Sequence, residues 1–203
     1  MDPFLAALIG YLLGSIPFGL LLTRFAGLGD VRNIGSGNIG ATNVLRTGNK
    51  RLAAFTLLGD LAKGLASVLI ARALFDQPDP MPQAAYGPVP VAALAAVLGH
   101  CFPVWLGFKG GKGVATNAGV CFGLAWPIGL TYALVWIGLL AGIRISSLAG
   151  MSAVVCAAIA AALLGYTAFV PVLIVIAVLV IWLHRDNVKR LMRGEEPKVG
   201  AKK

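Results

Sequence analysis

Long apolar stretches alternate along the chain with short polar segments that carry most of its charge. The apolar stretches lie at residues 3–25, 52–75, 89–106, 114–124, 127–143, 147–164 and 168–183. Most of them reach the roughly 17–25 residues with which an α-helix crosses a bilayer. The pattern predicts an all-α, polytopic membrane protein with seven transmembrane helices in one domain over residues 1–203, of which residues 184–203 form a basic tail.

The number of spans depends on the segment between Lys112 and Arg144. Its 31 residues are long for one helix and short for two, and a break near Trp126 and Pro127 would divide it. With this break, 15 of the 17 Lys and Arg residues fall on one side of the membrane, as the positive-inside rule requires. We therefore expect the N-terminus outside, and the tail and the main polar loops in the cytoplasm.

Composition narrows the class of protein further. Hydrophobic residues make up 58% of the chain, charged residues 12%, and the mean hydropathy is +0.85. These values exclude a soluble globular enzyme, a disordered chain and a fibrous one. The net charge of +9 suits the topology and also an anionic substrate, whereas so apolar a chain argues against nucleic acid. The first apolar run lacks a basic leader, so we expect it to be a retained span.

No metal or disulfide site is expected. The three cysteines lie far apart in apolar runs, where cysteine is usually a packing residue. No cluster of metal-ligating residues occurs in the sequence, so we predict an activity independent of metals and cofactors.

The first polar loop contains a dense run of small and hydrogen-bonding residues at 35–48. Three of its glycines fit the spacing G-x-G-x-x-G, but no strand precedes them, and this excludes a dinucleotide fold. Ser36, Asn38 and Asn43 offer neutral hydrogen-bonding groups, and Arg46 adds a bidentate cation. The combination suits a phosphate or carboxylate, although an ordinary Gly/Asn/Ser connecting loop is the alternative.

A second glycine-rich loop, Phe-Lys-Gly-Gly-Lys-Gly-Val-Ala-Thr-Asn, covers residues 108–117. The P-loop pattern of nucleoside triphosphatases, G-x-x-x-x-G-K-[ST], is absent. The backbone nevertheless leads into a helix whose free N–H groups and dipole favour an anion, and a basic cytoplasmic turn is the alternative. The candidate anion-binding residues are Lys109, Gly110, Gly111, Lys112, Gly113 and Thr116.

Two charged residues occur inside the second span. Asp60 and Lys63 are three residues apart and therefore share a helix face, either as a structural pair or as part of a substrate site. His100, at the end of the third span, is more typical of a structural hydrogen-bonding residue.

Further polar candidates lie at the cytoplasmic ends of the last two spans. Ser146 and Ser147 begin the sixth span, where a serine either caps the helix or binds the ligand. His184 and Asn187 share a face if the last helix continues, although a basic lipid anchor is the alternative. From these residues alone, an enzyme and a transporter of organic phosphates both remain open, whereas a purely structural protein leaves the polar loops unexplained.

The same segments, in this order, resemble the bacterial acyl-phosphate:glycerol-3-phosphate acyltransferases over nearly the whole chain. The resemblance implies an enzyme of the cell inner membrane that transfers a fatty acyl group from acyl phosphate to glycerol 3-phosphate. Lysophosphatidic acid and phosphate are the products, in phospholipid biosynthesis. Membrane lipid and the soluble enzyme that makes acyl phosphate are the implied partners. The motifs are Gly14-Ser-Ile-Pro17, the loop 35–46, Asp60-x-x-Lys63-Gly64, Gly99-His100-x-x-Pro103, the loop 108–116, Ser146 and His184-Arg185-x-Asn187.

The resemblance also implies roles for individual residues. Lys112, His184 and Ser36 are the catalytic candidates, and His184 either orients the acceptor or takes its proton, unless a substrate phosphate does so. We rank Ser146 ahead of Ser147. The His-x-x-x-x-Asp motif of the soluble-type enzymes is absent. The substrate-binding candidates are Asn38, Asn43, Arg46, Lys109, Gly110, Gly111, Gly113, Thr116, Ser146, Arg185 and Asn187.

Overall fold

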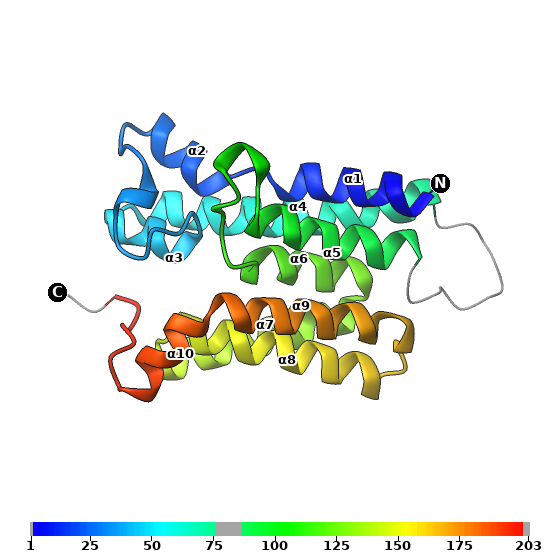
Figure 1. Cartoon of the computed structure of the whole chain (residues 1–203). Coiled ribbons are helices and arrows are strands. Elements are labelled where there is room, and N and C mark those ends of the chain that lie inside the picture. The colour runs from blue at the N-terminus through cyan, green and yellow to red at the C-terminus, as the bar shows by residue number, and fades with distance from the viewer. Residues whose placement is uncertain (1, 76–86, 201–203) are drawn as a thin grey trace.

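The computed structural model describes residues 2–75 and 87–200, and within these ranges it contains helices and loops but no strand, which confirms the all-α prediction. Figure 1 shows the helices running side by side in a bundle. The α-helices are α1 (Asp2–Gly14), α2 (Phe18–Phe25), α3 (Ala41–Val44), α4 (Lys50–Phe75), α5 (Pro88–Cys101), α6 (Val114–Leu124), α7 (Trp126–Ile143), α8 (Ser146–Leu163), α9 (Val170–Leu183) and α10 (Arg185–Met192). Short 3₁₀ turns are η1 (Val31–Asn33), η2 (Leu45–Thr47), η3 (Val104–Leu106) and η4 (Thr167–Phe169).

Five helical segments of the described chain are long and apolar enough to cross a membrane, and a sixth is formed if α9 and α10, bent by 60°, count as one span. The predicted fourth span is the helix α6, with only 11 residues. At about 1.5 Å per residue it rises roughly half the thickness of a hydrocarbon core of about 30 Å. The helix is therefore where the sequence predicts it, and the count of seven crossings stays a prediction.

Small residues let neighbouring helices approach closely. On α1, Gly14 lies against the backbone of Ala96 on α5, and on α4, Gly64 lies against the backbone of Thr116 on α6. A Cβ atom at either glycine would collide with a carbonyl group of the opposite helix. In lipid, where apolar surface alone does not drive helices together, such close contact is a main source of association.

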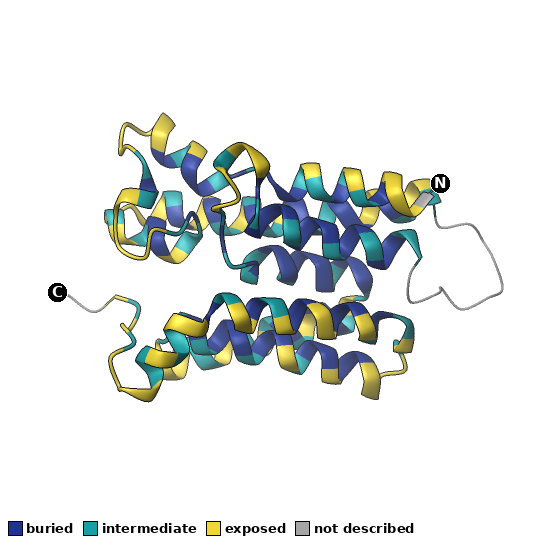
Figure 2. Cartoon of the chain, viewed as in Figure 1, coloured by how far each residue is buried: buried dark blue, intermediate teal, exposed yellow. Residues whose placement is uncertain are grey.

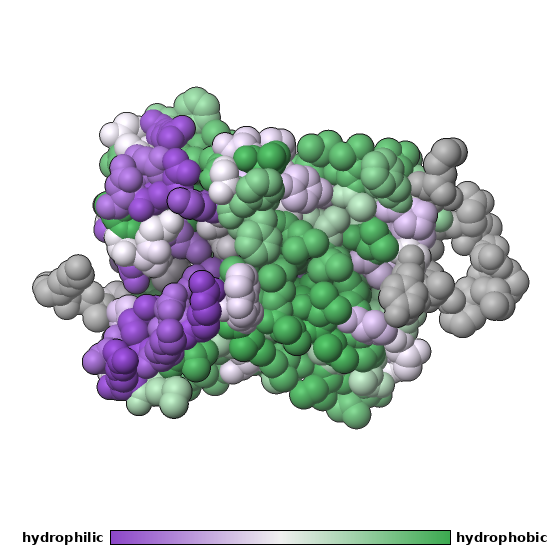
Figure 3. All heavy atoms as spheres, in the orientation of Figure 1, coloured by the Kyte–Doolittle hydropathy of each residue, from purple (hydrophilic) through white to green (hydrophobic). Residues whose placement is uncertain are grey.

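Apolar residues cover the middle of the bundle in the view of Figure 3, and Figure 2 shows that exposed and buried positions alternate along the helices. Leu134 is 63% exposed and Leu163 is 80% exposed, while Thr56, Ser67 and Thr116 are fully buried. This distribution is the reverse of that in a soluble protein and fits a surface that faces lipid.

Hydrophilic residues gather at one end of the molecule (Figure 3). Figure 1 shows that α1 begins at the opposite end from α10 and the segment that follows it. Leu106, in η3, packs against the core of the first polar loop around Val31 and Val44. At the tail, the Val199 N–H donates to the Arg144 carbonyl oxygen at 2.7 Å. The polar loops predicted to share a side therefore do lie together.

Candidate active site

Asn43 organises the first polar loop from within. Its buried Nδ2 group lies within 2.8 Å of the carbonyl oxygens of Val31 and Asn38, and its Oδ1 accepts the Ser36 N–H at 3.0 Å and Arg46 Nη1 at 3.4 Å. The Asn38 side chain similarly accepts the N–H of Gly40. Both amides thus fold the loop, and their predicted contact with substrate stays a prediction.

The first loop presents an exposed hydroxyl beside an exposed cation. Gly35 has φ +55°, and a Cβ atom there would collide with the Arg46 guanidinium. Glycine therefore allows Arg46 to lie against the backbone next to Ser36. Both side chains are accessible at the polar end of the bundle, as an anion-binding role requires.

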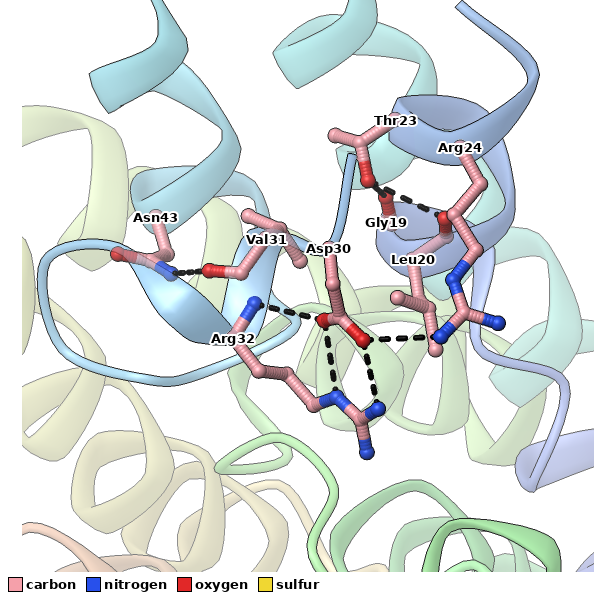
Figure 4. Close-up of polar contacts among 8 residues, drawn as sticks. All are labelled: Gly19, Leu20, Thr23, Arg24, Asp30, Val31, Arg32 and Asn43. Atoms are coloured by element: carbon pink, nitrogen blue, oxygen red, sulfur yellow. Dashed lines mark hydrogen bonds and ion pairs between the residues drawn. The ribbon is translucent and has the colours of Figure 1, made fainter. Parts of the chain in front are cut away.

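A charged cluster fixes the entry to this loop (Figure 4). Asp30 Oδ2 accepts Arg32 Nη2 at 2.7 Å and Arg24 Nη2 at 2.9 Å, while Oδ1 accepts the Arg32 backbone N–H and Nε. The Arg32 guanidinium holds the pKa of Asp30 well below its usual range, with help from Arg24. Two of the cations that indicated the topology, Arg24 and Arg32, thus also stabilise the loop through Asp30.

The second glycine-rich loop lies across the end of α5. The N–H of Gly110 donates to the Cys101 carbonyl oxygen at 3.1 Å, and that of Gly111 to the His100 carbonyl oxygen at 2.9 Å. A Cβ atom at Gly111 would enter the imidazole of His100. Two of the N–H groups expected to bind phosphate are therefore used within the protein. Those of Lys112 and Gly113 donate to no group in the described parts of the chain.

Behind this loop lies a buried polar trio formed by Asp60, Lys63 and His100. Lys63 Nζ is 2.8 Å from Asp60 Oδ1 and donates to the Ile16 carbonyl oxygen at 2.8 Å. His100 Nδ1 lies 3.5 Å from the same Asp60 oxygen. The structure therefore forms the Asp60–Lys63 pair that the spacing predicts, and it joins His100 to that pair.

At the junction of α9 and α10, a predicted residue of the second glycine-rich loop contacts a predicted residue of α10. Lys112 Nζ donates to Asn187 Oδ1, which joins the glycine-rich loop to α10. Gly113 lies against Val97 and Val180, so the start of α6 is packed between α5 and α9. Burial, followed by the repulsion of Arg190, lowers the pKa of Lys112. Its ammonium group is thus a partly desolvated cation at the polar end of the bundle.

His184 is buried at the end of α9. Its Nδ1 lies 2.7 Å from the Val180 carbonyl oxygen. Because a carbonyl oxygen only accepts, Nδ1 carries the proton and Nε2 is left as an acceptor. Burial lowers the pKa of His184 to about 4. The imidazole is therefore neutral at pH 7.

A residue that sequence reasoning did not find, Glu196, completes this cluster. Ser147 Oγ and Asn187 Nδ2 each donate to Glu196 Oε1 at 2.6 Å, and Arg190 Nε donates to Oε2 at 2.7 Å. Its side chain is only 6% exposed. Burial by itself would raise the pKa of Glu196, but the hydrogen bonds from Ser147, Asn187 and Arg190 lower it below its usual range.

The other predicted residues occupy different surroundings. Ser147, ranked second, contacts the cluster, while Ser146 is half-buried at the first position of α8. Arg185 is exposed and stacks on Trp182 at 4.7 Å from the ring centroid. Lys109 is exposed, and the hydroxyl of Thr116 is buried without a partner in the described parts of the chain.

An apolar groove begins where the glycine-rich loop ends. It has a volume of about 170 Å³ between α4, α6 and α7, and its accessible lining is entirely apolar. Val114, directly after Gly113, is its first residue along α6. The residues that line the groove are Leu57, Leu61, Val114, Ala115, Ala118, Phe122, Tyr132, Ala133, Trp136 and Ile137.

These features define an α-helical integral membrane protein with a candidate anion-binding cluster, formed by Lys112, Ser147, Asn187, Arg190 and Glu196, close to an apolar groove. The family model described as glycerol-3-phosphate acyltransferase matches residues 4–194. The chain therefore belongs to the glycerol-3-phosphate acyltransferase family, as its motifs predict.

Relatives and solved structures agree along the full length. The chain is 66% identical to the glycerol-3-phosphate acyltransferase of Erythrobacter litoralis, covering 100% of this chain and 98% of the relative. Its identity to that of Mesorhizobium japonicum is 56%, covering 98% and 96%. The fold is similar to crystal structures of PlsY (YgiH), an integral membrane glycerol 3-phosphate acyltransferase. For the glycerol 3-phosphate form, the TM-score is 0.89 at 38% identity, covering 98% of this chain and 96% of the other. For the lysophosphatidic acid form, the TM-score is 0.86 at 37% identity, covering 98% and 95%.

Proposed function

We propose that this protein transfers a fatty acyl group from acyl phosphate to glycerol 3-phosphate, giving lysophosphatidic acid and phosphate. The observation that carries the proposal is the continuity between Lys112, in the anion-binding cluster, and the groove that starts at Val114. A phosphate at Lys112 would leave an attached acyl chain at the mouth of an apolar channel. The two PlsY structures, named for glycerol 3-phosphate and lysophosphatidic acid, support the acceptor and the product.

The reaction needs little covalent chemistry from the protein, because acyl phosphate is a mixed anhydride and already activated. A glycerol hydroxyl attacks the acyl carbonyl carbon, the new ester C–O bond forms, and the bond to the phosphate oxygen breaks. Lys112 and Arg46, with the amide of Asn187, hold the phosphates and stabilise the charge that develops on the leaving group. Ser36, Ser146 and Thr116 add hydrogen bonds.

The proton of the attacking hydroxyl goes to an oxygen of the donor's own phosphate. As the anhydride bond breaks, the departing phosphate becomes a stronger base than an imidazole whose pKa is about 4, and its oxygens lie next to the attacking hydroxyl. His184 instead orients the acceptor through its Nε2, which accepts a hydrogen bond from a glycerol hydroxyl.

The seven-span topology belongs to the same proposal, with the N-terminus outside and the active site facing the cytoplasm at the inner membrane. It is supported by the position of the polar loops at one end and of the start of α1 at the other. Single cysteines placed at Asn49 and Gly194 should react with a membrane-impermeant thiol reagent only when it reaches the cytoplasmic face. Labelling of the two positions from opposite faces would contradict the topology.

The reaction is tested with purified protein in lipid nanodiscs, supplied with acyl phosphate and glycerol 3-phosphate. Lysophosphatidic acid and phosphate should appear in equal amounts, and phosphate release should depend on glycerol 3-phosphate. A chelator should leave the rate unchanged. Phosphate release that is independent of the acceptor, or transfer only from another acyl donor, would overturn the proposal. Co-purification would test the further proposal that the soluble enzyme making acyl phosphate is a partner.

A further inference from the structure

Glu196 lies in the segment that follows α10, where its neighbour Glu195 has a different environment. The Glu195 side chain is exposed, whereas that of Glu196 is 6% exposed and turned toward the anion-binding cluster. The segment is anchored again three residues later, where Val199 pairs with Arg144 through its N–H and its carbonyl oxygen. The backbone on both sides of Glu196 is therefore held near the start of α8.

The carboxylate connects its own segment to residues on two helices. One oxygen accepts hydrogen bonds from Ser147 on α8 and Asn187 on α10, and the other accepts from Arg190 one turn further along α10. All three bonds have lengths of 2.6–2.7 Å, as is typical of charge-assisted hydrogen bonds. Glu196 therefore fixes α8 and α10 relative to each other at this point.

The carboxylate also determines which way the Asn187 amide points. Asn187 receives the ammonium group of Lys112 at Oδ1 and donates from Nδ2 to Glu196. A rotation of the amide by half a turn would place its NH₂ group against a cation and its oxygen against an anion. Only one orientation is therefore compatible with both neighbours, and in this orientation Asn187 holds Lys112 in place.

We infer that Glu196 is a positioning residue for glycerol 3-phosphate binding, which acts by orienting Asn187 and thereby Lys112. The inference rests on the proposed function, in which these two residues hold substrate phosphate. Glu196 itself does not contact substrate, because its carboxylate would repel a phosphate and its two oxygens are already occupied by protein donors.

The test compares Glu196→Gln with Glu195→Gln, which makes the same chemical change one residue away on an exposed side chain. In nanodiscs, calorimetry measures the Kd of glycerol 3-phosphate, and steady-state kinetics measures the kcat and KM of acyl transfer. We expect Glu196→Gln to weaken binding and raise KM by roughly 10- to 100-fold, because a charge-assisted network is lost. Glu195→Gln should remain within about twofold of the unmodified protein.

A double-mutant cycle separates positioning from a general structural role. In an Asn187→Ala background, Glu196→Gln should change the Kd by less than about threefold, since the group it orients is already gone. Glu196→Asp, which keeps the charge, should retain more affinity than Glu196→Gln and provides the second variant if the Gln protein does not fold. Three outcomes would each overturn the inference. Glu196→Gln could cause the same loss of affinity in both backgrounds, or it could leave the Kd of glycerol 3-phosphate unchanged. It could also tighten binding, as expected if the Glu196 carboxylate competes with the substrate phosphate.

The two proposals fail in different ways. If the unmodified protein binds glycerol 3-phosphate but transfers no acyl group from acyl phosphate, the proposed donor is wrong. The double-mutant cycle, measured by the Kd of glycerol 3-phosphate, still tests the role of Glu196. If transfer proceeds and the cycle shows no coupling, the function stands and the role of Glu196 is refuted.

Discussion

The imidazole of His100 lies directly against the backbone of Gly111, in the space that a Cβ atom at position 111 would need. The two residues are also joined by the Gly111 N–H, which donates to the His100 carbonyl oxygen at 2.9 Å. On its other side the imidazole faces the Asp60–Lys63 pair. The course of the glycine-rich loop is thus fixed by a ring that itself lies next to a buried ion pair.

Gly111→Ala should therefore distort the loop and lower acyl transfer by at least about tenfold, because inserting a methyl group into a packed site costs typically 1–3 kcal/mol. Combining it with His100→Ala should restore part of the activity by removing the ring. Activity and melting temperature are measured for both. Gly138→Ala, where the added methyl group meets open space, is the control. A double variant less active than Gly111→Ala alone would contradict this steric explanation.

Lys112→Ala should lower kcat/KM by about 100-fold, because a partly desolvated cation that contacts phosphate is lost. Lys112→Arg should lose less, since it keeps the charge but not the geometry. Steady-state kinetics with varied glycerol 3-phosphate and acyl phosphate will show which KM changes. Lys189→Ala removes a cation whose side chain is 69% exposed and should have little effect. Full activity of Lys112→Ala would refute the site.

Acid should destabilise the folded protein through His184. Burial lowers its pKa from the usual 6.5 to about 4, so between these values the unfolded chain binds a proton that the folded protein does not. The free energy of unfolding therefore decreases as pH falls from 6.5 toward 4, and this contribution is fully present above 6.5. Melting temperatures across this range should decrease less steeply in His184→Gln. Parallel curves for the two proteins would show that His184 does not make this contribution.

Filling the apolar groove should affect long acyl chains selectively. Ala133→Phe places a ring in the groove wall, and we expect a roughly tenfold rise in the KM of long-chain acyl phosphates with little change for short ones. Leu134→Phe, at the adjacent lipid-facing position, is the matched control. An equal effect of Ala133→Phe on all chain lengths would place the acyl chain elsewhere.

The helices could be predicted from the sequence because apolar runs in a membrane protein are long and end at polar or helix-breaking residues. The break near Trp126 is present, with an extended Ala125 between α6 and α7. The first apolar run, in contrast, is divided near Pro17 into α1 and α2. The physical reason is the ring of proline, which lacks an N–H and disfavours helix for the preceding residue.

Parts of the candidate site could be predicted from residues close in sequence, or from polar residues that interrupt or follow the apolar runs. The Asp60–Lys63 pair follows from helical spacing, and Lys112 and Asn187 follow from unusual polar residues between apolar runs. Glu196 carries no such signal, because its burial depends on how the segment after α10 folds back on α8. The choice between Ser146 and Ser147 also depends on helix rotation, and the structure turns Ser147 toward Glu196.

The shortness of α6 has a consequence for how deep the chemistry takes place. A helix of 11 residues that belongs to a bundle of bilayer thickness cannot begin at the headgroup level and also reach the far leaflet. If α6 completes a crossing, as the seven-span proposal requires, the glycine-rich turn before it would sit beneath the headgroups, and water would follow polar side chains inward to meet the acyl carbonyl. A thicker host bilayer would then lengthen this aqueous inlet, and turnover should depend on lipid chain length.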